Sequence, residues 1–245
     1  MYDRPHHQRI ARVLESLDGG LLREHRCWFG GGTAISLRLG EFRESVDIDF
    51  LVSDGAGYRE LRQRLRGATS LAPLLRDGVA ALPLTREWRM DQYGLRGFVD
   101  IGLQPIKFEI VNEGRIEFAH PGAADEVCGV ATLGWNDLAA SKLLANADRW
   151  RDDGVFSRDA IDLAFIDLPP RKLKPALDKA IAAYGGSVAT DLEKALATLR
   201  ERTGWLARCV AALSIHEPPA AVQQKLRRLG RRLLAVTRQA ADAAR

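Results

Sequence analysis

Two aspartates in an otherwise apolar segment constrain the fold of this chain more than any other feature of its sequence. In the run VDIDFLV, Asp47 and Asp49 alternate with Val46, Ile48 and Phe50. Successive side chains of a strand point to opposite faces, so both carboxylates would share one face and the apolar side chains the other. Like charges this close raise the pKa of at least one carboxyl unless a cation lies between them. The pattern therefore predicts a buried strand with a site for Mg²⁺ or Mn²⁺, cations that prefer oxygen ligands.

The residues before this strand fit the same kind of site. The run FGGGT contains Gly31 and Gly32, which permit a tight turn and a close approach of the backbone to a ligand. Thr33 would open a helix over about residues 33–39, whose free N–H groups favour a phosphate. A glycine run alone indicates only a turn. Together with an Asp-x-Asp strand just downstream, it predicts a nucleoside triphosphate held between the turn and the metal.

The remaining pattern predicts an α+β region followed by a helical one. Up to about residue 130, helical patterns at 6–17 and 57–66 alternate with short strand patterns, of which RGFVDIG, IKFEIV and RIEFA follow close together. After about residue 135 the pattern is almost entirely helical. We therefore expect a domain with a small mixed sheet over residues 1–132 and a helical C-terminal domain over residues 133–245.

Composition limits the location and the classes of site. The N-terminal segment has no apolar signal-peptide core, and the 245 residues contain no run of about 18 apolar residues, so a cytoplasmic protein without a membrane span is expected. Cys27, Cys128 and Cys209 are too far apart in sequence to suggest a disulfide framework or a zinc site. His6 and His7 have no metal-ligating companions at suitable spacing and are expected at the surface.

Two segments of the chain resemble a known family. The run Gly31-Gly32-Thr33, followed by Asp47-Ile48-Asp49-Phe50, is similar to the signature of the DNA polymerase β-like nucleotidyltransferase superfamily. The later segment ASKLLANADRW…FSRDAIDLAFI, residues 140–166, resembles the AbiEii/AbiGii toxin family within that superfamily. This family supplies the toxin of bacterial abortive-infection toxin–antitoxin systems. The resemblance covers about residues 28–166 and implies a polymerase β-like α+β domain followed by a helical domain.

The resemblance also implies a two-metal nucleotidyl transfer, in which a third carboxylate joins Asp47 and Asp49. Strand alternation in IKFEIV places Glu109 on one face with Lys107, so Glu109 is the expected third metal ligand. Asp100 in GFVDIG is the alternative ligand. An ion pair at a strand edge is the alternative role for Glu109.

Further candidate residues lie in the helical half. On a helix over about 137–149, Lys142 and Arg149 share a face, and Lys142 presents a flexible point charge suited to phosphates. The resemblance assigns functional positions to Lys142 and Asp162. Compensation of the helix dipole is the alternative for Asp159, and an ion pair with Arg158 or Arg149 is the alternative for Asp162. The predicted catalytic residues are Asp47, Asp49, Glu109, Lys142 and Asp162, and the predicted nucleotide-binding residues are Gly31, Gly32, Thr33, Lys142, Arg149 and Asp159.

The resemblance implies a metal-dependent nucleotidyltransferase toxin that acts on RNA, at the 3′ end of tRNA, and that has a cognate antitoxin. The basic segment 225–245, with Arg227, Arg228, Arg231 and Arg232, is suited to phosphate contacts, although a solvated helix face packed through leucines fits it equally well. Transfer to a small molecule such as an aminoglycoside is an alternative function. A non-catalytic RNA- or protein-binding module is another, which the intact carboxylate pair disfavours.

Overall fold

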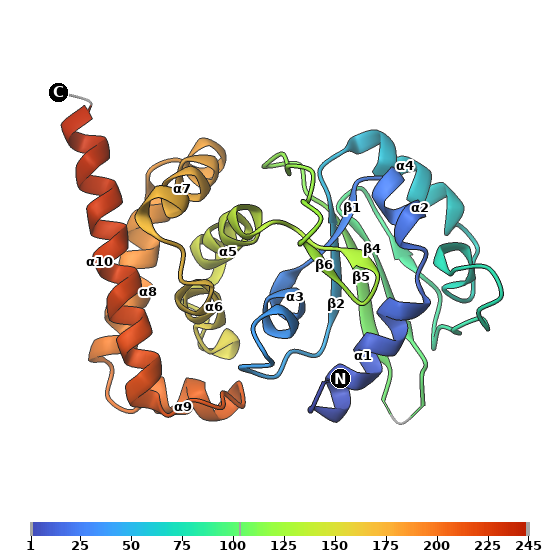
Figure 1. Ribbon diagram of the computed structural model, residues 1–245, viewed down its shortest axis with the longest axis horizontal. Coiled ribbons are helices and arrows are strands. Elements are labelled where there is room, and N and C mark those ends of the chain that lie inside the picture. Colours follow the sequence, from blue (N-terminus) through green and yellow to red (C-terminus); the bar gives the residue numbers. More distant parts are fainter. Residues whose placement is uncertain (1, 103, 244–245) are drawn as a thin grey trace. The chain divides into compact units, whose positions relative to one another are not determined.

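The computed structural model describes residues 2–102 and 104–243, and the chain divides into two compact units (Figure 1). The first unit comprises Met1–Glu41 and Ser45–Gly134, and the second comprises Phe42–Glu44 and Trp135–Arg245. The short segment 42–44 thus belongs to the second unit, although residues of the first unit flank it in the sequence.

The first unit is built on a five-stranded mixed sheet with the strand order β1-β2-β5-β4-β3. Strand β2 pairs antiparallel with β1 and parallel with β5, while β4 pairs antiparallel with both β5 and β3. These strands are β1 Cys27–Gly30, β2 Ile48–Val52, β3 Arg89–Met90, β4 Gly94–Val99 and β5 Ile106–Asn112, and a separate two-stranded ribbon is formed by β6 Glu126–Val127 and β7 Val130–Ala131. The predicted α+β class with a small mixed sheet is confirmed.

Helices cover both faces of this sheet. Helix α3 lies on one side, and α2 and α4 lie on the other (Figure 1). Asp18 and Asp54 precede α2 and α4, and their carboxylates accept hydrogen bonds from backbone N–H groups of the first turns, which fixes where these helices begin. The helical elements of this unit are α1 Pro5–Ser16, α2 Gly19–Glu24, α3 Gly31–Arg38, α4 Gly55–Arg64 and the 3₁₀ turn η1 Ala72–Leu74.

Alternation along the central strands separates an apolar face from a polar one. On β2, Ile48 and Phe50 are fully buried, and on β5 Phe108 and Ile110 are fully buried. Each such side chain contributes about 1.5–3 kcal/mol by leaving water. The residues between them, Glu109 among them, are only half-buried on the opposite face. The apolar face of the sheet therefore packs into the core, and the opposite face carries the polar groups.

Two strand predictions were wrong, one in where the strand begins and one altogether. Strand β2 begins at Ile48 rather than at Val46, whose side chain is 49% exposed, so Asp47 precedes the strand instead of lying within it. The segment RIEFA forms no strand. The Glu113 carboxylate accepts hydrogen bonds from the backbone N–H and the guanidinium of Arg115, and this contact turns the chain before a strand can extend.

The second unit is helical. Helix α5 packs against α6, α7 and α8, and Ala139, Ala140, Leu143 and Leu144 on α5 are fully buried in these contacts. Helix α10 packs against α6, α7, α8 and α9. The elements are α5 Trp135–Arg149, the 3₁₀ turn η2 Asp153–Val155, α6 Arg158–Ile166, α7 Pro170–Tyr184, α8 Ser187–Glu201, α9 Trp205–Ala212 and α10 Pro219–Ala243. The predicted helical C-terminal half is confirmed.

Helix α10 has 25 residues and is long enough to cross a bilayer, but its sequence is rich in arginine. Among residues 2–102 and 104–243, every helix is either too short or too polar to span a membrane.

Candidate active site

A row of mostly polar residues crosses the sheet of the first unit. In the strand register, Asp49 on β2 lies opposite Glu109 on β5, and Glu109 lies opposite Arg96 on β4. The row ends at Gly30 on β1 and at Arg89 on β3. Residues that lie opposite one another on neighbouring strands point to the same face, so the carboxylates of Asp49 and Glu109 are neighbours. We refer to these five residues as the polar row.

The glycine turn lies directly against this row. Gly31 has a φ of +67°, a conformation that favours glycine, and a Cβ at this position would lie 2.4 Å from Oδ2 of Asp49. Gly32 follows in the first turn of α3. The structure therefore brings together the glycine turn and the second aspartate, with Gly31 required both by its backbone conformation and by the space that Asp49 occupies.

Thr33 fixes the backbone at Asp47. Its side chain is fully buried on α3, and Oγ1 lies 2.5 Å from the carbonyl oxygen of Asp47 and 2.9 Å from Oγ of Ser45. Because a carbonyl only accepts, the single Thr33 proton goes to Asp47 and the Ser45 hydroxyl donates to Thr33. The side chain of Thr33 thus positions Asp47 at the entrance to β2, where Asp47 and Asp49 are both half-buried.

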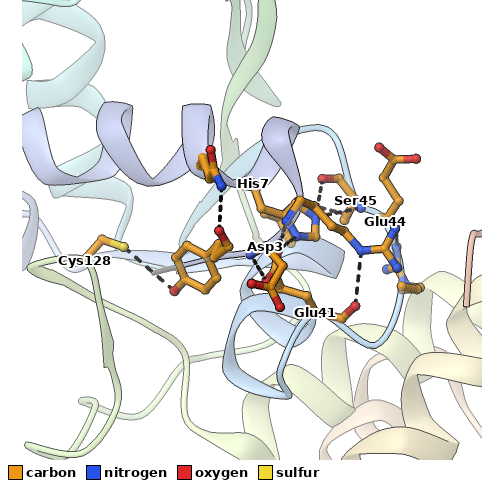
Figure 2. Close-up of polar contacts among 11 residues, drawn as sticks. Asp3, His7, Glu41, Glu44, Ser45 and Cys128 are labelled. Atoms are coloured by element: carbon orange, nitrogen blue, oxygen red, sulfur yellow. Dashed lines mark hydrogen bonds and ion pairs between the residues drawn. The ribbon is translucent and has the colours of Figure 1, made fainter. Parts of the chain in front are cut away.

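His7 was expected at the surface, and this prediction was wrong. Its ring is fully buried on α1, where it points toward Glu41 and Ser45 (Figure 2). Nδ1 lies 2.8 Å from Oε1 of Glu41, and Nε2 lies 3.1 Å from the backbone nitrogen of Ser45. Glu41 also accepts a hydrogen bond from the backbone N–H of Asp3 at 2.6 Å. His7 and Glu41 therefore tie the N-terminal segment to the loop that leads to Asp47.

The protonation of this pair follows from its surroundings. Burial lowers the pKa of His7, although the carboxylate of Glu41 opposes the shift. Burial alone would raise the pKa of Glu41, but the N–H groups of Asp3 and Arg4 and the ring of His7 outweigh it and lower the pKa. A neutral His7 beside an ionised Glu41 donates from Nδ1 to the carboxylate and accepts the N–H of Ser45 at Nε2.

Glu109 is held by two cations. Its Oε2 lies 2.6 Å from Nζ of Lys107, and its Oε1 lies 2.9 Å from Nε of Arg96. Among the described residues, no three His, Cys, Asp or Glu side chains are grouped so as to hold a metal ion. The half-buried oxygens of Asp47 and Asp49 fit the ligand chemistry of Mg²⁺. In this arrangement the third predicted ligand, Glu109, is engaged with the two cations.

The alternative third ligand, Asp100, is not brought to the aspartate pair. It follows the end of β4, which is not a neighbour of β2 in the sheet. Its side chain is exposed, and its carboxylate accepts a hydrogen bond from the backbone N–H of Gly102 at 3.0 Å. Its position is that of a turn-forming residue.

The candidate residues of the helical unit form one cluster of charges, which is buried except for the partly exposed Arg149. Asp162 is fully buried and binds Arg43 through two hydrogen bonds, of 2.6 Å to Nε and 2.9 Å to Nη2. Nζ of Lys142 lies 2.6 Å from Oδ2 of Asp162 and 2.9 Å from Oδ1 of Asp159. Asp159 also binds Nε of Arg149 at 2.7 Å. Three cations and two carboxylates thus lie in contact, and we refer to these five residues as the charge cluster.

Lys142 and Asp159 are buried and paired with opposite charges. Lys142 is 6% exposed and has two carboxylate partners. Burial would raise the pKa of Asp159, but Lys142 and Arg149 outweigh it and hold the pKa well below its usual range. The sequence did not indicate that Arg43 binds Asp162. Arg43 lies in segment 42–44, where no helical pattern could have pointed to this contact.

The basic segment of α10 divides into two pairs of arginines. Arg228 and Arg232 lie within 3.0 Å and 2.6 Å of Oδ1 of Asp167, and Arg232 also donates to the backbone carbonyl of Asp167. Arg227 and Arg231 are exposed, line a groove between α8 and α10, and have no acidic partner within the described part of the chain. Only the second pair is free to meet an external anion.

Comparison with known proteins places the chain in a family. The family model described as "Nucleotidyl transferase AbiEii toxin, Type IV TA system" matches residues 16–229. Two solved structures from Helicobacter pylori are similar in fold: JHP933, with a TM-score of 0.56, and a candidate nucleotidyltransferase, with a TM-score of 0.50.

Both are 15% identical to this chain. The first comparison covers 100% of this chain and 98% of JHP933, and the second covers 97% of this chain and 96% of the other protein. None of the curated proteins compared with the chain is a significant match. Because the family model covers most of the chain, including the glycine turn, both aspartates and the charge cluster, the chain belongs to the AbiEii family of nucleotidyltransferase toxins of type IV toxin–antitoxin systems.

Proposed function

We propose that the chain is a magnesium-dependent toxin that transfers a nucleotide from a nucleoside triphosphate to the 3′ end of tRNA. The observation that carries the proposal is the polar row, in which Asp49 lies opposite Glu109 and against Gly31, in a chain of the AbiEii family. Lys107 and Arg96 balance Glu109, whereas Asp47 and Asp49 supply half-buried carboxylates of the kind that Mg²⁺ prefers. This ligand chemistry supports a role in binding a metal.

In this proposal Asp47 and Asp49 hold Mg²⁺ or Mn²⁺, and Glu109 joins them as the third carboxylate. The bound metal would activate the attacking oxygen and stabilise the pyrophosphate that leaves. The protein's own contribution is positioning: Gly31 allows the chain to approach the site closely, and Thr33 holds the backbone of Asp47 through its hydroxyl.

An RNA acceptor is supported by the free arginines of α10. Arg227 and Arg231 lie one turn apart, and like charges at this spacing oppose each other unless an anion lies beside them. Phosphate contacts give a log–log salt slope of roughly −0.7 each on single strands. Replacing both residues by Gln should therefore reduce the slope of RNA binding by about 1.4, while Lys174→Gln, an exposed cation on α7, should leave it unchanged.

The direct test is transfer of label. The purified chain, Mg²⁺, each α-labelled nucleoside triphosphate and total RNA should yield labelled tRNA with at least one nucleotide, and chelation of the metal should abolish it. Asp49→Asn should also abolish labelling while the protein remains folded. Labelling of an aminoglycoside but not of RNA would replace the proposed acceptor. Transfer to neither acceptor, with any nucleotide, would contradict the proposal.

Metal binding has a test that does not depend on activity. Mg²⁺ or Mn²⁺ added with a nucleotide should raise the Tm of the wild-type protein, because a ligand that binds only the folded state stabilises it by mass action. Asp49→Asn should show a smaller shift. Equal shifts in both proteins would move the metal site away from Asp49.

A further inference from the structure

Two cations beside Glu109, Lys107 and Arg96, neither hold the proposed metal nor position Asp47. Lys107 precedes Glu109 by two residues on β5, and Arg96 lies opposite Glu109 on β4. Both bind the Glu109 carboxylate, Lys107 at 2.6 Å and Arg96 at 2.9 Å. The side chain of Glu109 is 13% exposed, whereas those of Lys107 and Arg96 are 35% and 33% exposed. The cations therefore form the outer, solvent-facing part of this contact.

The two cations share Glu109 as a partner but differ in their other ion pairs. Arg96 has a second acidic partner in Asp91, with 3.1 Å between Nη1 and Oδ2, while the only ion pair of Lys107 among the described side chains is the one with Glu109. An ion pair that is about one-third exposed adds little to stability because water screens it. Lys107 can thus exchange its partner at small cost.

We infer that Lys107, together with Arg96, binds the triphosphate of the incoming nucleotide; this inference rests on the proposed function. A triphosphate is a chain of acceptor oxygens with several negative charges, which a flexible ammonium follows and a guanidinium binds through two parallel hydrogen bonds. In the structure, the Glu109 carboxylate binds both cations. When a triphosphate binds, the cations move from Glu109 to phosphate oxygens, and the Glu109 carboxylate becomes available beside Asp49.

This exchange gives Glu109 two opposing effects on binding. Its negative charge competes with the triphosphate for Lys107 and Arg96, and the same carboxylate is the proposed third ligand of the metal. Removing the charge should therefore favour a polyphosphate without metal and disfavour transfer with metal. A residue that only braces the sheet would not produce effects of opposite sign.

The experiment measures Kd for inorganic tripolyphosphate and for ATP by calorimetry, in EDTA and in Mg²⁺. Lys107→Met keeps the apolar stem and removes the charge, and it should weaken binding of both probes about tenfold. The matched control is Arg115→Met, which removes a cation of comparable exposure that pairs with Glu113, a glutamate two residues away outside the polar row. This control should bind both probes as the wild type does.

A second variant keeps the inference testable if Lys107→Met is poorly folded. Glu109→Gln should bind tripolyphosphate in EDTA several-fold more tightly than the wild type, and it should fail to transfer nucleotide in Mg²⁺. Unchanged affinity in both Lys107→Met and Glu109→Gln would overturn the inference, even if the wild type labels RNA. Tripolyphosphate binding that depends on Lys107, in a protein that labels no acceptor, would support this site and contradict the proposed function.

Discussion

Replacing Asp159 by Asn tests whether the charge cluster of the helical unit acts as structure. Asp159 is 2% exposed and lies 2.9 Å from Nζ of Lys142 and 2.7 Å from Nε of Arg149. The amide preserves the shape of the side chain but removes the charge, so the three cations of the charge cluster are left with Asp162 as the one carboxylate of the cluster. Removing one partner of a buried ion pair costs about 3–5 kcal/mol. With about 2–4 °C per kcal/mol, the Tm should fall by roughly 6–20 °C.

The same group predicts how stability depends on pH. Burial would raise the pKa of the Asp159 carboxyl, but Lys142 and Arg149 outweigh it and lower the pKa. A group whose pKa is lowered by folding stabilises the native state fully above its unfolded pKa, about 3.9, and loses this contribution as the pH falls toward the folded value. The free energy of unfolding should therefore decrease below about pH 4 in the wild type, and less steeply in Asp159→Asn.

The assay is thermal and urea unfolding followed by circular dichroism at several pH values. The control is Asp178→Asn, which removes an exposed ion pair with Lys174 on α7 and should cost no more than about 0.5 kcal/mol. An Asp159→Asn protein that unfolds at the wild-type temperature, and has lost only nucleotide affinity, would refute the structural reasoning. It would assign Lys142 and Asp159 to binding instead.

Three further tests concern the first unit. Gly31→Ala should abolish transfer and destabilise the fold by more than Gly67→Ala, which has the same type of positive φ but no atom within 4 Å of the added Cβ; equal unfolding midpoints would contradict the close approach to Asp49. Glu109→Gln should lower kcat by orders of magnitude and Asp100→Asn should change it little; the reverse ranking in initial-rate measurements would make Asp100 the third ligand. His7→Phe should fill the buried volume, remove both ring hydrogen bonds and lower kcat by about 10²-fold with a smaller change in KM, because the loop before Asp47 loses its anchor; a wild-type kcat would reject this positioning role.

Strand alternation allowed much of the sheet to be predicted from sequence. In VDIDF and IKFEIV it placed the apolar side chains on one face, and Ile48, Phe50 and Phe108 are fully buried there. The same alternation favoured Glu109, and the register sets it opposite Asp49. Strand ends were less predictable because alternation continues past the last ladder hydrogen bond, as at Val46, which is apolar and yet exposed.

The sequence pattern did not indicate the contacts between residues that are distant in the sequence. His7 binds Glu41 from 34 residues away, and Arg43 binds Asp162 from 119 residues away. A periodic pattern reports which face a residue occupies, but not which residue of another element will meet it. The pattern therefore predicts His7 at the surface and gives Asp162 the partners Arg158 or Arg149, whereas the structure supplies Arg43 from segment 42–44.

Lys142 and Lys107 are both candidate phosphate ligands, and they differ in the free energy needed to separate each from its carboxylate partners. Helical spacing correctly placed Lys142 and Arg149 on one face, since both bind Asp159. For Lys142 to reach a phosphate it must leave Asp159 and Asp162, both buried, and breaking such a pair costs about 3–5 kcal/mol. Lys107 must leave one carboxylate at a site about one-third exposed, where an ion pair is worth about 0–1 kcal/mol. A triphosphate is therefore expected to bind Lys107 at a lower cost than Lys142, which links α5 to α6 through Asp159 and Asp162.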